Sequence, residues 1–171
     1  GIASELGVRF DTDAEIARIR RRIETSPERD YLASRGEYLG SRLLAAFLEV
    51  PFVDAEKTVV FRENGALDPE ATNKALGQAL IGLTRAVIPG FYGADKNGVI
   101  HTFSRGGSDV TGALVARAVR ASLYENWTDV SGMLMGDPRI IEKPAGIAHI
   151  SYRELRELSY MGATVLHEDA V

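Results

Sequence analysis

Apolar positions recur at helical spacing in two long stretches near the start of the chain. Over residues 14–25 they lie three or four residues apart, which predicts an amphipathic helix that Asp11 can cap. A second helix is predicted over residues 27–49, with Ser26 as its cap. Because proline cannot continue a helix, this second helix should end before Pro51.

Three further helices are predicted along the rest of the chain. One covers residues 69–83 and opens on Asp-Pro-Glu, and another covers residues 110–119 behind a Ser-Asp cap. The helix over 110–119 is apolar nearly all round, so we expect it to be buried against a sheet. The last helix covers residues 155–160 and follows a Ser-x-x-Glu capping box that starts at Ser151.

Short runs of β-branched and aromatic residues predict the strands. Residues 57–61 form one run and residues 122–127 another, at whose end Trp127 is expected to lie in the core. The apolar segments 84–92 and 99–103 flank an Asn-Gly pair, which is a strong hairpin signal. We therefore predict one layered α/β domain, without internal repeats, whose mostly parallel sheet includes one antiparallel hairpin.

The composition fits a single globular domain and excludes several classes of protein. The chain has 171 residues and 18.6 kDa, with 45% hydrophobic and 26% charged residues. Twenty-four acidic and 20 basic residues give a net charge of -4, and no long basic segment predicts a nucleic-acid partner. No apolar run has membrane-spanning length and no export signal is visible, so we expect no membrane partner and a cytoplasmic location.

The residue inventory also limits metal binding and suggests a truncated chain. There is no cysteine, so disulfides and thiolate metal sites are excluded. The three histidines, His101, His149 and His167, lie far apart, and we predict no metal site built from protein side chains alone. The sequence starts at Gly1 without an initiator methionine and stops shortly after a predicted helix, so we expect a piece of a longer protein, cut at both ends.

Residues 104–109, Ser-Arg-Gly-Gly-Ser-Asp, are the first candidate site. Gly106 and Gly107 let the backbone approach a ligand, and the N–H groups at the start of the next helix favour an anion. Arg105 can form two hydrogen bonds to one carboxylate or phosphate. The same residues also fit an ordinary glycine turn with a serine cap and an exposed arginine.

Two further segments are candidates on weaker patterns. A strand ending in Thr-Asp at residues 128–129, with a glycine-punctuated loop after it, could hold a nucleotide, or could simply precede two turns. Gly36 and Gly40 lie within a predicted helix, where glycine costs about 1 kcal/mol relative to alanine. We therefore expect another backbone or a ligand to approach there, beside Glu37, although a helical glutamate is more often a solvated surface charge.

Taken together, the short motifs resemble those of the aspartokinases, which are members of the amino acid kinase family. The segments that carry the resemblance, in order, are residues 34–37, 90–93, 105–109, 127–132, 137–139 and 162–167. The resemblance covers the chain from about Tyr31 onward. It implies ATP-dependent phosphorylation of the side-chain carboxylate of L-aspartate to 4-phospho-L-aspartate, the first step toward lysine, threonine and methionine.

The resemblance also implies roles for individual residues. The implied catalytic residues are Glu37, Arg105 and Asp109. The implied aspartate-binding residues are Glu37, Phe91, Arg105, Gly106, Gly107, Ser108 and Asp109. The implied ATP-binding residues are Thr128, Asp129, Leu134, Asp137, Arg139, Thr164 and Val165. Mg²⁺ would accompany ATP, and the full-length protein would form a homo-oligomer.

The sequence departs from the family pattern in ways that bear on activity. No Lys-x-Gly-Gly turn precedes Asp11, the regulatory ACT domains are absent, Thr164 stands where the family usually has lysine, and Leu134 where it often has tyrosine. We therefore expect this piece alone to be inactive. The alternatives are another amino acid kinase, acting on glutamate, acetylglutamate or a carbamate, and a binding module without catalysis.

Overall fold

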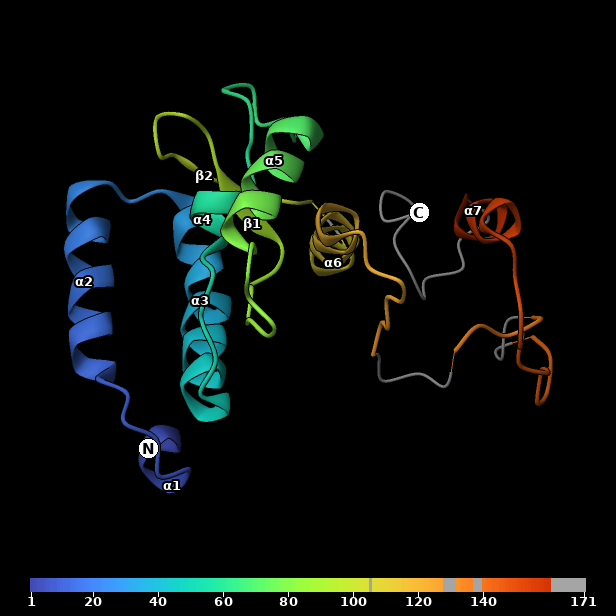
Figure 1. Cartoon of the computed structure of the whole chain (residues 1–171), viewed down its shortest axis with the longest axis horizontal. Helices are drawn as coiled ribbons and strands as arrows, with labels where there is room; N and C mark the ends of the chain where they lie inside the picture. The colour runs from blue at the N-terminus through green and yellow to red at the C-terminus, as the bar shows by residue number, and fades with distance from the viewer. Residues whose placement is uncertain (105, 128–131, 137–139, 161–171) are drawn as a thin grey trace.

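The structure is a computed structural model that describes residues 1–104, 106–127, 132–136 and 140–160 (Figure 1). Its elements, in chain order, are α1 (Ile2–Glu5), α2 (Thr12–Thr25), α3 (Arg29–Leu48), α4 (Ala55–Thr58), α5 (Pro69–Ala79), β1 (Tyr92–Ala94), β2 (Ile100–Thr102), α6 (Gly107–Val119) and α7 (Tyr152–Tyr160). Helices α2 and α3 lie side by side, with α4 and the β1–β2 hairpin next to α3. Helix α7 lies beyond α6, on the side away from α3 (Figure 1).

Helix α2 begins as predicted, whereas α3 begins two residues later than predicted. The Asp11 carboxylate accepts a hydrogen bond from the N–H of Ala14 at 2.9 Å and so caps α2. Ser26 does not cap α3, because its hydroxyl donates instead to the Glu28 carboxylate at 2.7 Å. Helix α3 ends at Glu49, whose left-handed backbone (φ 54°) breaks the helix before Pro51, as predicted.

The strand predicted over residues 57–61 is largely wrong. Its first half belongs to helix α4, because the Asp54 carboxylate accepts a hydrogen bond from the N–H of Glu56 at 3.0 Å and nucleates a helical turn. Only Val60 and Phe61 pair like strand residues, each in an isolated bridge. The local cap therefore outweighed the β preference of the residues that follow it.

The hairpin around Asn97 is confirmed, with shorter strands than predicted. Strands β1 and β2 pair antiparallel, and the Asp95 carboxylate accepts hydrogen bonds from the N–H groups of Asn97 (2.9 Å) and Val99 (3.0 Å) inside the turn. Strand β1 does not extend farther back because Phe91 has a left-handed backbone (φ 57°).

The mixed α/β class is confirmed. Among the described residues, parallel pairing occurs as two isolated bridges, Phe52 with Val87 and Val60 with Ala94. The larger hydrophobic core lies between α3, α4 and the hairpin, where Tyr38 and Tyr92 are almost fully buried. This core fixes the position of α3 relative to the loop before β1.

Helix α6 packs against helix α5 rather than against a sheet. Leu76 of α5 is buried between Val110 and Leu114 of α6, which form a second, smaller core. The helix is also less buried than predicted, since Val119 is 48% exposed. The predicted Ser-Asp cap is also wrong: the cap position is Gly106, whose φ of 57° is a conformation that glycine adopts without strain.

Two other helix ends can be compared with their predictions. Asp68 caps α5 as expected, accepting a hydrogen bond from the N–H of Ala71 at 3.0 Å, but the helix ends at Ala79 instead of residue 83. The capping box of α7 is confirmed, with the N–H of Ser151 donating to the Glu154 carboxylate at 2.9 Å.

Within the described ranges, no helix has both the length and the apolar character that a membrane crossing requires.

The strand predicted over residues 122–127 is wrong, as is the burial of Trp127. The described structure has no strand there, and Trp127 is 89% exposed. The ring of Tyr124 packs on α6 instead, close to Gly112. Contacts with helix α6, from the Tyr124 ring and from the Asn126 amide to Asp109, hold the segment where a neighbouring strand was expected.

Candidate functional site

A cavity of about 410 Å³ lies between helix α3, helix α6 and the loop that leads into β1. Glu37 of α3, Gly90 of the loop and Ser108 of α6 all line it, together with Tyr124. Two of the sequence-predicted substrate residues, Glu37 and Ser108, therefore share one cavity although they are far apart in the chain.

Glu37 is tied to the loop before β1. The backbone N–H of Gly90 donates a hydrogen bond to the Glu37 carboxylate at 3.3 Å, across a separation of 53 residues. The side chain is half-buried, so it is not the solvated surface glutamate of the alternative interpretation. No other backbone approaches Gly36 or Gly40, since a Cβ at either position would meet nothing within 4 Å among the described residues; the alternative, approach of a ligand, stays a prediction.

Phe91 and Gly107 form a tight joint behind the cavity. A Cβ at Gly107 would lie 2.7 Å from the Cβ atom of Phe91, which only glycine permits. The N–H of Phe91 donates to the Thr111 hydroxyl at 3.1 Å, and that hydroxyl donates to the carbonyl of Gly107 at 2.7 Å. The loop before β1 and the first turn of α6 are thereby held together. Phe91 itself is not among the cavity-lining residues that the structure describes.

Asp109 lies in the first turn of α6, close to the cavity. Its carboxylate accepts a hydrogen bond from the Asn126 amide at 3.3 Å. A negative charge in the first turn is favoured by the helix dipole. Burial and the Asp109 charge raise the pKa of the Tyr124 hydroxyl, which shows that these two side chains interact electrostatically.

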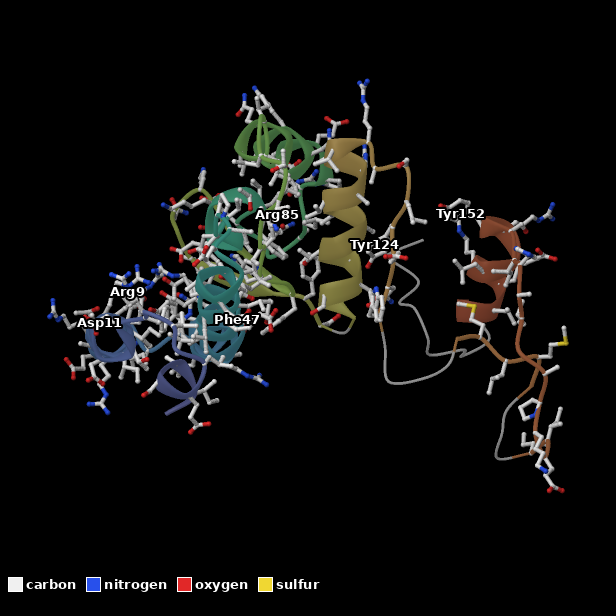
Figure 2. All side chains as sticks on the ribbon, turned by 60° about the horizontal axis from the view of Figure 1, so that its bottom comes forward. Arg9, Asp11, Phe47, Arg85, Tyr124 and Tyr152 are labelled. Atoms are coloured by element: carbon white, nitrogen blue, oxygen red, sulfur yellow. The ribbon has the colours of Figure 1, made fainter. Side chains whose placement is uncertain are left out.

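Sequence reasoning did not identify two residues of this region, Tyr124 and Thr111. Tyr124 lies against α6 in Figure 2, and a Cβ added at Gly112 would collide with its hydroxyl. Gly112 interrupts a helix that is otherwise rich in apolar residues, and this interruption was the available signal that a ring packs there. Thr111 could have been suspected from its place one turn after Gly107.

The remaining predicted site residues are only partly placed. Those outside the described residues are Arg105, Thr128, Asp129, Asp137, Arg139, Thr164 and Val165. Leu134 is described: it forms an isolated antiparallel bridge with Gly146 and is 38% exposed. Within the described residues, no three acidic, histidine or cysteine side chains form a group suited to bind a metal ion.

Comparison with known proteins assigns the chain to a family. The model of the amino acid kinase family matches residues 3–171. The chain belongs to the amino acid kinase family.

The similar proteins within that family are aspartokinases. Aspartokinase 3 of Bacillus subtilis is 35% identical over 158 residues, which cover 86% of this chain and 35% of that protein. The crystal structure of Clostridium acetobutylicum aspartate kinase superposes with a TM-score of 0.90 at 50% identity, covering 99% of this chain and 39% of that one. Escherichia coli aspartokinase III in complex with aspartate and ADP gives a TM-score of 0.80 at 29% identity, covering 95% and 42%. The chain thus spans less than half the length of these relatives.

Proposed function

We propose that this chain is part of an aspartokinase and that the cavity between α3 and α6 binds L-aspartate. One observation carries the proposal: Glu37 and Ser108, both implied by the aspartokinase motifs, line the same cavity. The similarity to an aspartokinase whose structure contains aspartate and ADP supports aspartate and an adenine nucleotide as the ligands.

The chemistry of the side chains fits a free amino acid with a second carboxylate. Such a substrate needs an anionic partner for its ammonium group. We assign this role to the carboxylates of Glu37 on α3 and Asp109 on α6. It also needs donors for a carboxylate, which we assign to Arg105 and to the N–H groups at the start of α6. Gly107 allows Phe91, and with it the loop before β1, to pack against the start of that helix.

The reaction would transfer the γ-phosphoryl group of ATP to the side-chain carboxylate of aspartate. A carboxylate oxygen forms the new bond to phosphorus, the bond between phosphorus and the bridging oxygen breaks, and ADP leaves with the electron pair. Mg²⁺ bound to ATP offsets charge on the phosphoryl oxygens. We assign ATP binding to the segments around Thr128–Asp129, Leu134, Asp137–Arg139 and Thr164–Val165.

We infer that the 171 residues alone bind aspartate and turn it over poorly. The family's phosphate-binding Lys-x-Gly-Gly turn does not occur in this sequence, and Thr164 replaces the usual lysine. In the full-length protein we propose a cytoplasmic homo-oligomer that serves lysine, threonine and methionine synthesis.

Isothermal titration of the chain with L-aspartate tests the binding step. We expect Glu37→Gln to weaken aspartate binding at least about tenfold, because a charge-assisted contact to ammonium contributes roughly 1.5–3 kcal/mol. Glu24→Gln, an exposed glutamate on α2, is the matched control and should bind as the unmodified chain does. Equal affinity of the two variants would contradict the assignment of Glu37.

Other ligands separate this proposal from its alternatives. N-acetyl-aspartate lacks the ammonium group and should bind more weakly than aspartate, whereas tighter binding of glutamate or acetylglutamate would indicate another amino acid kinase. Trapping of the acyl phosphate by hydroxylamine, measured on the full-length protein, distinguishes an enzyme from a binding module.

A further inference from the structure

A second cavity, of about 550 Å³, lies on the opposite face of helix α3, between α2, α3 and α4. Residues 31, 35, 38 and 42 of α3 line it, at the spacing of one helix face. Glu37 lies more than a quarter turn away from that face, and its cavity is lined by a different set of residues. The second cavity is therefore separate from the proposed aspartate site.

The floor of this cavity contains a buried guanidinium group without a counter-charge. Arg35 is only 7% exposed. Its Nε donates to the carbonyl of Tyr31 at 3.2 Å, and its Nη2 donates to the Ser34 hydroxyl at 2.9 Å. Both acceptors are neutral, and Arg35 forms no ion pair with any described residue. Its Nη1 group donates to none of them.

Aromatic rings surround this guanidinium and cannot accept its remaining hydrogen bonds in the plane. The centre of the guanidinium lies 4.2 Å from the ring centroid of Tyr31, 4.8 Å from that of Tyr38 and 5.3 Å from that of Tyr92. Cation–π contacts of this kind offset part of the cost of burying the charge. They leave the N–H groups at the edge of the plane available to an acceptor in the cavity.

The charge balance of the walls is positive. The cationic lining residues are Arg18, Arg22, Arg35, Arg42 and Lys57, and the acidic ones are Asp54 and Glu56. Glu56 is engaged by Arg22 at 3.0 Å. Asp54 accepts a hydrogen bond from the Tyr92 hydroxyl at 2.8 Å. Among the described residues, neither carboxylate forms an ion pair with Arg35.

Arg18 and Arg42 have an ion-pair partner outside the cavity, whereas Lys57 has none among the described residues. Arg18 and Arg42 both contact the Glu15 carboxylate, at 2.6 Å and 3.1 Å. Lys57, on the exposed side of α4, forms no ion pair with a described residue. Arg35 at the floor and Lys57 at the rim thus have no carboxylate as an ion-pair partner among the described residues.

We propose that this cavity binds a small molecule through an oxyanion, either a phosphate or a carboxylate group. The oxyanion would accept one hydrogen bond from Nη1 of Arg35 and one from the second N–H of Nη2, the paired geometry in which a guanidinium holds two oxygens of one group. Lys57 would supply a second positive charge at the rim. The rings of Tyr31, Tyr38 and Phe52 leave an apolar wall for the organic part of the ligand.

Arginine Nε–Hε resonances of the ¹⁵N-labelled 171-residue chain report on this cavity directly. The chain is titrated separately with sodium phosphate and with sodium succinate, at an ionic strength held constant with sodium chloride. We expect the Arg35 resonance to shift and saturate with at least one of the two anions, and the tighter one identifies the group bound. Arg35→Met assigns the resonance and should abolish saturable binding.

Because Arg35→Met removes a buried side chain on which folding can depend, Lys57→Met provides a second test on an exposed residue. We expect Lys57→Met to weaken the apparent affinity about two- to fivefold, as expected for one partly screened charge. Arg20→Met, an exposed arginine of α2 outside the cavity, is the matched control and should leave the affinity unchanged. A shift that does not saturate with either anion, or equal affinities of Lys57→Met and Arg20→Met, would overturn the proposal. Neither outcome bears on aspartate binding at Glu37.

Discussion

Replacement of Gly107 by alanine tests whether the joint behind the proposed aspartate site is as tight as the structure indicates. A Cβ at Gly107 would lie 2.7 Å from the Cβ atoms of Phe91 and Phe103 and 2.8 Å from the Cα atom of Phe91. Real Cβ atoms do not make such contacts, and the neighbouring atoms belong partly to the backbone. Either the loop before β1 or the first turn of α6 must therefore move.

The magnitude follows from two opposing effects. Forcing an extra carbon into a packed region costs about 1–3 kcal/mol. Alanine is favoured over glycine within a helix by about 1 kcal/mol, which opposes that cost. We expect Gly107→Ala to lower the free energy of unfolding by up to about 2 kcal/mol, and also to weaken aspartate binding, since Gly90 and Ser108 flank the joint.

Urea denaturation followed by far-UV circular dichroism measures this effect. Gly40→Ala in α3 is the matched control, because a Cβ at Gly40 would meet nothing within 4 Å. There the helix preference acts alone, and the stability should rise by about 0.5–1 kcal/mol. If Gly107→Ala were as stabilising as Gly40→Ala, the close packing of Phe91 on α6 would be refuted.

Two further predictions concern Asp68 and Trp127. The hydrogen bond from the N–H of Ala71 lowers the pKa of Asp68, so its contribution to stability is complete above the unfolded value of 3.8 and is lost as the pH falls through the lower folded value. Asp68→Asn should therefore flatten the acid limb of a plot of urea midpoint against pH, and an unchanged limb would argue against the cap. The single tryptophan, 89% exposed, should be quenched by acrylamide as readily as a free indole, and protection from acrylamide would contradict its exposure.

The features that sequence reasoning predicted correctly are those fixed by neighbours in the chain. Asp11, Asp68 and the Ser151–Glu154 box each form their capping hydrogen bond within three residues. The turn around Asn97 is held in the same way by Asp95. In each case the residue type and its spacing determine the hydrogen bond, so the local sequence was sufficient.

The features that were missed depend on contacts made at long range or on competing local caps. Residues 57–61 have the composition of a strand, but the cap at Asp54 draws the first of them into helix α4. Residues 122–127 also have a strand-like composition, yet Tyr124 and Asn126 make their contacts with helix α6 and not with a strand. A strand needs a partner, and composition alone does not supply one.

The candidate site was predictable only through the family resemblance. Spacing alone favoured a surface charge for Glu37 and left residues 104–109 as either an anion site or an ordinary turn. The hydrogen bond that joins Glu37 to Gly90 spans 53 residues, so local sequence could not reveal it. The cationic cavity was missed for a different reason. Its aromatic and arginine residues recur on one face of α3, which was visible in the sequence, but that pattern also describes an ordinary buried helix face.

Helix α3 separates two electrostatic environments, and its sequence explains how one short segment serves both. Successive residues of a helix are 100° apart, so Arg35 and Glu37, which are two residues apart, point in nearly opposite directions. The acidic face meets the N–H of Gly90, and the basic face meets three tyrosine rings. If the charges of Arg35 and Glu37 shared one face they would neutralise each other as an ion pair. Their separation by the helix backbone leaves a carboxylate for a cationic group on one side and a guanidinium for an anionic group on the other.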